Sequence, residues 1–338
     1  MTKPLLSIIV PCYNEIHFIE DFILNIPNLE SIYFHLEFII VDGGSDDGTK
    51  QVIESYLETF NLTLIVSEEN IVPKSLNLAI SKSTGTFIAR LDVHSKYPKG
   101  YLEKLYLNFL NIPNCGNIGF RVNTIAPALD DISICIAYFM SHPVGVGNSM
   151  FRIPCNGMIE VDTVPFGFFR KSDLISIGGY DEEMYKNEDD ELNLRLKKNG
   201  KLIILLCSES IDYYTRPDLR KASKMMFQYG FFKPLLIKKN RILSSYRQLA
   251  PPLFVLTLTI SILAIPLTMV FLSVICLLYG FLMTKLWYNC NISQDRPSNK
   301  SFENLIEMIT VSSLIVFIIF LARLIEFFLS LVKARPAK

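Results

Sequence analysis

The sequence has no excess of charge, because 33 Lys and Arg residues balance 33 Asp and Glu residues over 338 positions. Zero net charge argues against a nucleic-acid-binding protein that works through a strong positive field. Cysteine pairs of the Cys-x-x-Cys type are also absent. An odd number of isolated cysteines predicts free thiols in a reducing compartment. The seven are Cys12, Cys115, Cys135, Cys155, Cys207, Cys276 and Cys290.

A secretion signal is not evident at the start of the sequence. The first residues, MTKPLLSIIVPCYNE, contain an apolar run that is too short for a signal peptide and turns polar at once. We therefore expect the polar part of the chain to stay in the cytoplasm.

Charged residues are missing from Gln248 to Thr284, and a second apolar block covers residues 305–332. As one helix the first block would be about 55 Å long, which exceeds the roughly 30 Å hydrocarbon core of a bilayer. Pro266 near its middle leaves open one kinked span or a hairpin of two. We predict a membrane region over residues 249–338 with two or three transmembrane helices; the basic tail KARPAK favours two.

A basic segment, residues 216–248, precedes this region and is expected to lie on the cytoplasmic side against anionic lipid. Residues 220–240 can be an amphipathic interfacial helix rich in Lys, Arg and aromatic residues. Equally, Gln228, Tyr229 and Gly230 can line an acceptor site. The sequence leaves both interpretations open.

Residues 1–215 have an ordinary soluble composition and alternate between short apolar runs and helical patterns. The runs at 5–10, 36–41, 62–67 and 85–91 are typical of buried strands, and helical spacing follows at 15–26, 49–60 and 72–81. This rhythm predicts an α/β domain with a mostly parallel, Rossmann-like sheet. Because ligands bind beyond the carboxyl ends of such strands, loops 12–15, 42–47 and 92–94 should converge on one rim.

The stretch FIARLDVHSKYP ends the fourth apolar run on Asp92 and places His94 two positions later. A carboxylate and an imidazole are both ligands for Mn²⁺ or Mg²⁺, and imidazole suits Mn²⁺ better. A metal there would hold a diphosphate and take up charge on a leaving group. The simpler interpretation is that Asp92 caps the next turn and His94 lies on the surface.

The loop DGGSDDGT, residues 42–49, follows the second apolar run. Its glycines permit close approach of a ligand to the backbone or positive φ angles. Asp42 can accept hydrogen bonds from a base or ribose, while Ser45, Asp46 and Asp47 can cap the next helix. A plain strand-to-helix turn is the alternative. The loop is not Gly-x-Gly-x-x-Gly, which disfavours a dinucleotide site.

The stretch NEDDELNLRLKKNG predicts a helix that begins near Glu188 and ends before Gly200. The helix dipole favours acidic residues in a first turn, which explains some of them. A first-turn carboxylate that faces the rim can also act as a general base toward an acceptor hydroxyl.

Together these motifs resemble the family 2 glycosyltransferases, which have the GT-A fold, over about residues 4–240. The signatures are IIVPCYNE (8–15), VDGGSDDGT (41–49), LNLAISKSTGTFIARLDVH (76–94) and GGYDEEMYKNEDDELNLRLKKNG (178–200). The stretches LDVHSKYP, HPVGVGNSMFRI and VDTVPFGFFRK are similar to the membrane-bound, succinoglycan-type sugar transferases. The resemblance to that subgroup favours three transmembrane helices.

The resemblance implies roles for residues at matching positions. Those expected at the nucleotide sugar are Pro11, Tyr13, Asn14, Glu15, Asp42, Ser45, Lys74, Asn77, Arg90 and Asp92. Asp92 and His94 take the place of the usual Asp-x-Asp metal motif, with His94 in place of the second Asp. Asp189 would be the catalytic base, and Glu188 would support it or contact the acceptor.

The resemblance further implies an inverting transfer of one hexose from a nucleotide-diphosphate sugar, expected to be a UDP-sugar, with Mn²⁺ or Mg²⁺. The acceptor would be a polyprenyl-diphosphate-linked glycan at the cytoplasmic membrane, in capsule, exopolysaccharide or O-antigen synthesis. Processive synthases of the family carry Gln-x-x-Arg-Trp, whereas here Gln228 has no following Arg-Trp. A processive synthase, a nucleotidyltransferase and an idle membrane scaffold are the alternatives.

Overall fold

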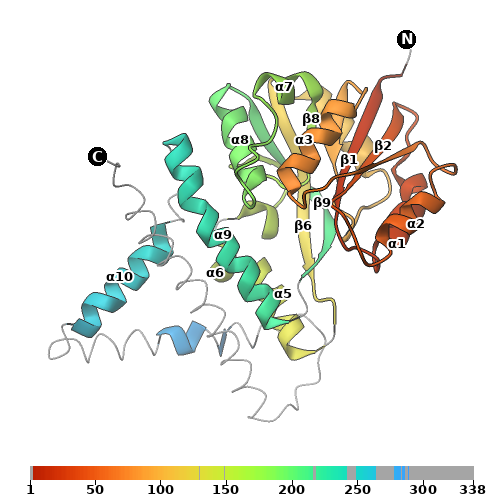
Figure 1. Cartoon of the computed structure of the whole chain (residues 1–338). Coiled ribbons are helices and arrows are strands. Elements are labelled where there is room, and N and C mark those ends of the chain that lie inside the picture. Colours follow the sequence, from red (N-terminus) through yellow and green to blue (C-terminus); the bar gives the residue numbers. More distant parts are fainter. Residues whose placement is uncertain are drawn as a thin grey trace, which may run out of the picture. The chain divides into compact units, whose positions relative to one another are not determined.

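The computed structural model describes residues 3–128, 130–147, 149–215, 218–241, 249–263, 278–282, 284–285 and 288. The chain forms two compact units, one of residues 1–123 with 150–213 and one of residues 124–149 with 214–338. The predicted catalytic domain, 1–215, thus includes a segment, 124–149, that belongs to the second unit. Figure 1 shows the whole chain.

The first unit is built on a sheet whose strands run in the order β3-β2-β1-β4-β8-β6-β9-β5, with β7 paired to β9. Its bounds are β1 Leu5–Cys12, β2 His35–Asp42, β3 Leu62–Val66, β4 Phe87–Arg90, β5 Ser95–Lys96, β6 Cys115–Ile125, β7 Met158–Glu160, β8 Phe168–Arg170 and β9 Leu202–Tyr214. Strands β3, β2, β1 and β4 are mutually parallel, as the sequence predicts. Beyond β4, strand β8 runs antiparallel to both of its neighbours, β4 and β6.

Helices connect these strands and cover both faces of the sheet. They are α1 Ile19–Leu24, η1 Ile26–Leu29, α2 Thr49–Ser55, α3 Val72–Lys82, α4 Tyr101–Asn111, η2 Met150–Arg152, α7 Lys171–Ser176 and α8 Glu188–Lys198. The helices predicted at 15–26 and 49–60 are shorter in the structure, because residues 16–18 and 56–60 form turns.

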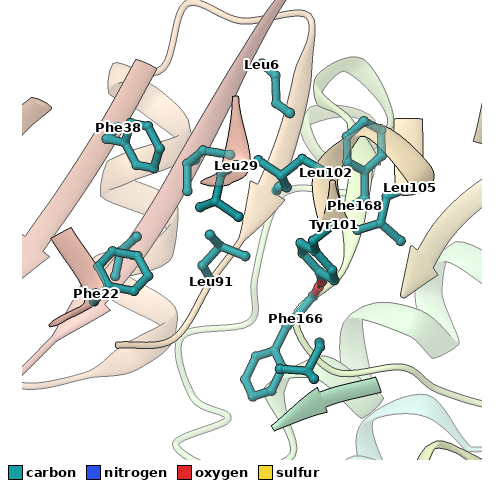
Figure 2. Close-up of a cluster of buried hydrophobic side chains, with 14 of the residues drawn as sticks. Leu6, Phe22, Leu29, Phe38, Leu91, Tyr101, Leu102, Leu105, Phe166 and Phe168 are labelled. Carbon is teal, nitrogen blue, oxygen red and sulfur yellow. The ribbon is translucent and has the colours of Figure 1, made fainter. Parts of the chain in front are cut away.

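The two faces of β1 explain why its sequence is a continuous apolar run. Successive side chains of a strand point to opposite faces, and Ile8 packs in one buried cluster while Ile9 packs in another. Residues of α1, α2 and α4 line the first cluster, and residues of α3, α7 and α8 line the second. Figure 2 shows part of the first cluster, where Tyr101 and Leu105 of α4 lie beside Phe168 of β8.

The second unit contains α5 Asp131–Ser141, α6 Pro143–Val146, α9 Leu219–Asn240 and α10 Ala250–Leu263. Ile136, Phe139 and Met140 of α5 pack with Ala222 and Met225 of α9. Among the residues described, no helix has both the length and the apolar character needed to cross a bilayer. Most of the predicted membrane region, including Pro266 and the block 305–332, lies outside the described residues.

The prediction that all cysteines are free thiols is wrong for two of them. Cys155, in the segment before β7, forms a disulfide with Cys207 of β9, with 5.4 Å between their Cα atoms. The pairing of β7 with β9 brings together two residues that are 52 positions apart in sequence, and no local spacing signals such a pair. Cys12, Cys115 and Cys135 are buried and form no disulfide.

We expect this disulfide to stabilise the first unit, because it closes a long loop of the unfolded chain. Its loss, by dithiothreitol or by Cys155→Ala, should lower the free energy of unfolding by about 2–4 kcal/mol. Thermal denaturation with and without the reductant measures the effect. A Cys155→Ala/Cys207→Ala variant is the control, and an equal response of that variant to dithiothreitol would contradict the assignment.

Candidate active site

The carboxyl ends of β1, β2 and β4 bring the predicted loops to one edge of the sheet. Cys12 at the end of β1 pairs with Asp42 at the end of β2, and the Leu91 amide just after β4 donates to the carbonyl of Ile9 at 3.1 Å. Asp92 therefore follows β4 directly into the rim. The convergence expected from the strand pattern is thus present within the first unit.

A buried guanidinium lies at the centre of this edge. Arg90, the last residue of β4, donates to the Asp189 carboxylate at 2.7 Å. Its other terminal nitrogen lies 3.1 Å from a Glu188 oxygen and 3.6 Å from an Asp92 oxygen. The Arg90 side chain is only 5% exposed. One cation therefore joins the end of β4 to the first turn of α8 and balances part of the charge of three carboxylates.

Burial raises the pKa of the Asp189 carboxyl from its ordinary value to about 7, although the Arg90 guanidinium opposes this rise. The neighbouring negative charges of Glu188, Asp92 and Asp190 act in the same direction as burial. About 18% of the Asp189 side chain is still exposed. A carboxylate that is accessible and titrates near neutrality has the properties of a general base.

Phe166 supports Arg90 from the adjacent loop. The guanidinium carbon lies 5.8 Å from the centre of the Phe166 ring, within cation–π range. Phe166 has a φ of +51°, which is rare for a bulky side chain. The Tyr101 hydroxyl lies 3.3 Å from the Phe166 carbonyl oxygen (Figure 2), and the Arg90 amide donates to the Gly167 carbonyl at 3.0 Å. Sequence analysis missed Phe166, for which the Pro-Phe-Gly turn was the available signal.

Buried polar contacts fix helix α8, which carries Asp189. The Asn193 amide donates to the Thr163 hydroxyl at 2.8 Å and to the Val164 carbonyl at 3.0 Å, and it accepts from Asn117 at 2.7 Å. Asn193 lies one turn after Asp189 and is fully buried. This network holds α8 against β6 and the loop before β8. Sequence analysis did not identify Asn193.

A second anchor of α8 is the pair of Glu191 and Arg195, whose side chains are joined by hydrogen bonds of 2.5 to 2.9 Å. Arg195 also donates to the carbonyls of Ile177 and Gly179 at 2.6 and 2.7 Å. The helix is thereby tied to the turn that precedes it.

Asn77 of α3 holds the other side of that turn. It donates to the Tyr180 carbonyl at 2.9 Å and accepts from the Tyr180 amide at 2.8 Å. Gly179, with a φ of +71°, leaves no room for a side chain, because a Cβ would lie 2.5 Å from the Asn77 amide oxygen. Lys74, one turn earlier on α3, is exposed and donates to Glu69 at 2.5 Å. The roles of Asn77 and Lys74 toward a nucleotide stay predictions.

The loops after β1 and β2 are joined by three consecutive backbone amides. The amide of Asn14 donates to the Ser45 hydroxyl at 2.9 Å, that of Glu15 to the Thr49 hydroxyl at 2.9 Å, and that of Ile16 to Asp47 at 3.1 Å. Asn14 has a φ of +53°, which lets the chain turn toward the second loop. The segment YNE and the loop DGGSDDGT therefore form one structure.

Six predicted nucleotide residues lie in these loops or at the ends of the strands before them: Pro11, Tyr13, Asn14, Glu15, Asp42 and Ser45. Pro11 lies within β1, and Tyr13 just after it is 41% exposed. Asp42, by contrast, is fully buried and its carboxylate accepts hydrogen bonds from the amide and the hydroxyl of Ser45. The Asp42 carboxylate thus shapes the loop from inside, and its direct contact with a base or ribose stays a prediction.

Cys12 also lies among these loops, and its thiol is not a nucleophile candidate. Burial and the neighbouring carboxylates of Glu15 and Asp42 raise the pKa of the Cys12 thiol far above its ordinary value. A thiol that stays protonated is inert.

The predicted metal ligands, Asp92 and His94, lie together after β4. The Nδ1 atom of His94 is 3.1 Å from a carboxylate oxygen of Glu15, an arrangement common for metal-ligating histidines. No group of three or more His, Cys, Asp or Glu side chains placed for a metal occurs in the part of the chain that the structure describes. A carboxylate and an imidazole are nevertheless suitable ligand types for Mn²⁺ or Mg²⁺, since such ions often take their remaining ligands from phosphates and water.

Comparison with known proteins agrees with this geometry. Residues 7–131 match the family Glycosyl transferase family 2. The chain is 27% identical over 248 residues to the succinoglycan biosynthesis protein ExoA of Rhizobium meliloti, covering 72% of this chain and 73% of that protein. It is 25% identical over 247 residues to a dolichyl N-acetyl-alpha-D-glucosaminyl phosphate 3-beta-D-2,3-diacetamido-2,3-dideoxy-beta-D-glucuronosyltransferase of Methanococcus voltae, covering 70% and 74%.

The fold is similar to that of a solved mannosyltransferase, PcManGT of Pyrobaculum calidifontis, in complex with GDP-Man and Mn²⁺. The TM-score is 0.60 at 18% sequence identity, and the match covers 96% of this chain and 88% of the other. This likeness confirms the GT-A-like α/β fold. The family match over residues 7–131 and the curated relatives support a glycosyltransferase that resembles the family 2, succinoglycan-type enzymes.

Proposed function

We propose that this glycosyltransferase moves a single hexose, with inversion, from a nucleotide-diphosphate sugar to a lipid-linked saccharide during glycan biosynthesis. The observation that carries the proposal is Asp189, an accessible carboxylate whose pKa lies near 7 and which Arg90 holds at the rim of the parallel strands. The family 2 match over residues 7–131 includes Arg90, Asp92 and His94 but not Asp189.

Asp189 would act as the general base. Its free oxygen accepts the proton of the acceptor hydroxyl as the hydroxyl oxygen attacks the anomeric carbon, and the bond from that carbon to the diphosphate breaks on the opposite face. Arg90 keeps the carboxylate in position and partly offsets its charge. Glu188, 3.1 Å from Arg90, supports the same cluster, and a contact with the acceptor is proposed for it.

Asp92 and His94 are the residues that would hold a divalent ion, which when bound offsets the charge of the departing nucleoside diphosphate. Imidazole among the ligands favours Mn²⁺ over Mg²⁺. The mannosyltransferase of similar fold is in complex with Mn²⁺.

The donor is proposed to be a UDP-sugar, on the resemblance to succinoglycan-type enzymes, with a GDP-sugar as the alternative that the similar mannosyltransferase suggests.

Transfer of one sugar is favoured over processive synthesis because Gln228 lacks the following Arg-Trp. The paired Glu188 and Asp189 disfavour a nucleotidyltransferase, which needs no hydroxyl-activating base of this kind. The pairing of Arg90 with both Asp92 and Asp189 disfavours an idle scaffold.

A lipid-linked acceptor at the cytoplasmic membrane is supported by the relative from Methanococcus voltae, whose name specifies a dolichyl-linked sugar phosphate, and by helix α9. The buried residues of α9, among them Ala222, Met225 and Leu236, lie on one side of the helix. The opposite side carries an exposed row, spaced three, four or seven residues apart: Arg220, Lys224, Phe227, Phe231 and Lys238. We name this row the α9 stripe.

Two stacked phenyl rings, Phe227 and Phe231 with centroids 6.2 Å apart, form the middle of the α9 stripe. Arg220 and Lys224 lie at one end of the stripe and Lys238 lies at the other. Such a surface fits an anionic lipid interface, where aromatic rings enter the headgroup boundary and Lys and Arg attract lipid charge.

The first experiment measures nucleoside diphosphate release by the full chain in detergent, with UDP- or GDP-sugars and a polyprenyl-diphosphate-linked acceptor. We expect transfer with Mn²⁺ and its loss in EDTA. Asp189→Asn should lower kcat about 10²- to 10⁴-fold, as expected for loss of a general base. Asp190→Asn, the same change at the next position, is the control and should retain most activity.

An Asp189→Asn variant with the rate of the wild type would refute the base assignment. Release of sugar 1-phosphate in place of nucleoside diphosphate would instead identify a nucleotidyltransferase, because transfer of the nucleoside monophosphate breaks the bond between the two phosphates of the donor.

The pH profile of kcat/KM should fall on the acid side of about pH 7. Because the pKa of Asp189 is raised, the carboxyl is protonated below that pH and cannot accept a proton. Glu188→Gln removes a negative charge that raises this pKa, so the acid limb should move to lower pH. An acid limb that stays in place in Glu188→Gln would show that another group controls it; Glu20→Gln, far from the cluster in sequence, is the control.

The α9 stripe predicts contact with anionic lipid. A Phe227→Trp indole, introduced into a Trp287→Phe background that removes the only native tryptophan, should be quenched by brominated lipids in phosphatidylglycerol-containing vesicles. Charge reversal by Arg220→Glu, Lys224→Glu and Lys238→Glu should reduce this quenching, because the stripe then repels the surface. Unchanged quenching after charge reversal would contradict a role of the stripe at anionic lipid.

A further inference from the structure

Glu15 and His94 are in contact although they come from loops 79 residues apart. An oxygen of the Glu15 carboxylate is 3.1 Å from Nδ1 of His94. Both side chains are mostly shielded from solvent, at 19% and 17% exposure. A carboxylate that is ionised only accepts hydrogen bonds, so the contact requires the proton of the neutral imidazole on Nδ1. The lone pair is then on Nε2.

Two aromatic rings limit the orientation of the imidazole. Tyr213 of β9 meets the His94 ring edge-on with centroids 5.4 Å apart, and Phe18 does so at 6.4 Å. Tyr213 in turn lies under the guanidinium of Arg152, whose central carbon is 5.5 Å from the ring centre. Packing on the ring and a hydrogen bond to Nδ1 together fix where Nε2 lies.

Glu15 is itself held at its backbone. Its amide donates to the buried Thr49 hydroxyl, and the amides on either side donate to Ser45 and Asp47. The joined loops after β1 and β2 therefore hold the backbone of Glu15 in place and bring its carboxylate to His94.

We propose that Glu15 is a positioning residue that fixes His94 as the Nδ1–H tautomer and so makes Nε2 available to a divalent ion. The inference rests on the metal-assisted function proposed above, and it gives Glu15 a task different from the direct nucleotide contact expected from sequence. A carboxylate that accepts from the other ring nitrogen sets the tautomer and basicity of a metal-binding histidine. The joined loops would thereby couple the nucleotide-binding region to the metal ligand.

The direct test observes the tautomer in metal-free protein. The full chain is labelled with ¹⁵N-histidine, purified in detergent with EDTA and examined by NMR at pH 8. There are four histidines, and His94→Asn identifies the signals of His94. We expect a protonated Nδ1 in the wild type, retention of that tautomer in Glu15→Gln, whose amide oxygen still accepts, and a shift toward Nε2–H in Glu15→Leu.

The second readout is Mn²⁺ affinity, measured by electron paramagnetic resonance in the presence of UDP. Glu15→Leu should bind Mn²⁺ about 10- to 100-fold more weakly than the wild type, and Glu15→Gln should be close to the wild type. Glu20→Leu, which removes a carboxylate that bonds Tyr56 at the surface, is the matched control and should change neither readout.

The results separate the inference from the function on which it rests. An Nδ1–H tautomer that persists in Glu15→Leu overturns the inference, as does a shifted tautomer with unchanged Mn²⁺ affinity. A wild-type chain that binds no Mn²⁺ overturns the metal part of the proposed function and the metal role of Glu15, while a tautomer change in Glu15→Leu would still confirm the hydrogen bond itself.

Discussion

The arrangement of the active site depends on the buried guanidinium of Arg90. Asp92, Glu188 and Asp189 lie around it, and without a cation three carboxylates in this shielded region would repel one another. A buried cation is stable only when it is paired, and removal of one partner leaves a charge uncompensated. Arg90 therefore links the end of β4 to the start of α8. The stacking of Phe166 and the anchors of α8, Asn193 and Arg195, all act on this one link.

This arrangement also explains the different properties of carboxylates that are close in space. Asp42 is buried but satisfied by Ser45, so it can shape a loop without a cation. Asp189 is shielded and flanked by like charges, so its pKa rises and proton transfer near neutrality becomes possible. Glu15 is engaged by a histidine. The chemical properties of each carboxylate follow from its neighbours rather than from its residue type.

Much of this site was predictable from the sequence, for identifiable reasons. The apolar runs before Cys12, Asp42 and Asp92 indicated parallel strands, and strand direction then brought their loops together. The start of helix α8 near Glu188 was likewise predicted from the acidic residues of its first turn. The contacts of Phe166, Asn193 and Asn77 were not predictable, because each partner lies tens of residues away and no periodic pattern marks it. The same holds for the Cys155–Cys207 disulfide. Asp42 shows a further limit, since a polar residue at a strand tip can face inward.

The three backbone amides that join the segment after β1 to the loop after β2 have a consequence for protein engineering and for the divergence of related chains. A graft of one loop from another transferase, intended to change the donor sugar, would lose the hydroxyl and carboxylate acceptors that Asn14, Glu15 and Ile16 require. The loss of an acceptor costs more the more an amide is shielded, and the hydrogen bonds of Glu15 and Ile16 are partly buried. The two loops must therefore be exchanged as a pair, and substitutions in one are expected to be inherited together with compensating substitutions in the other.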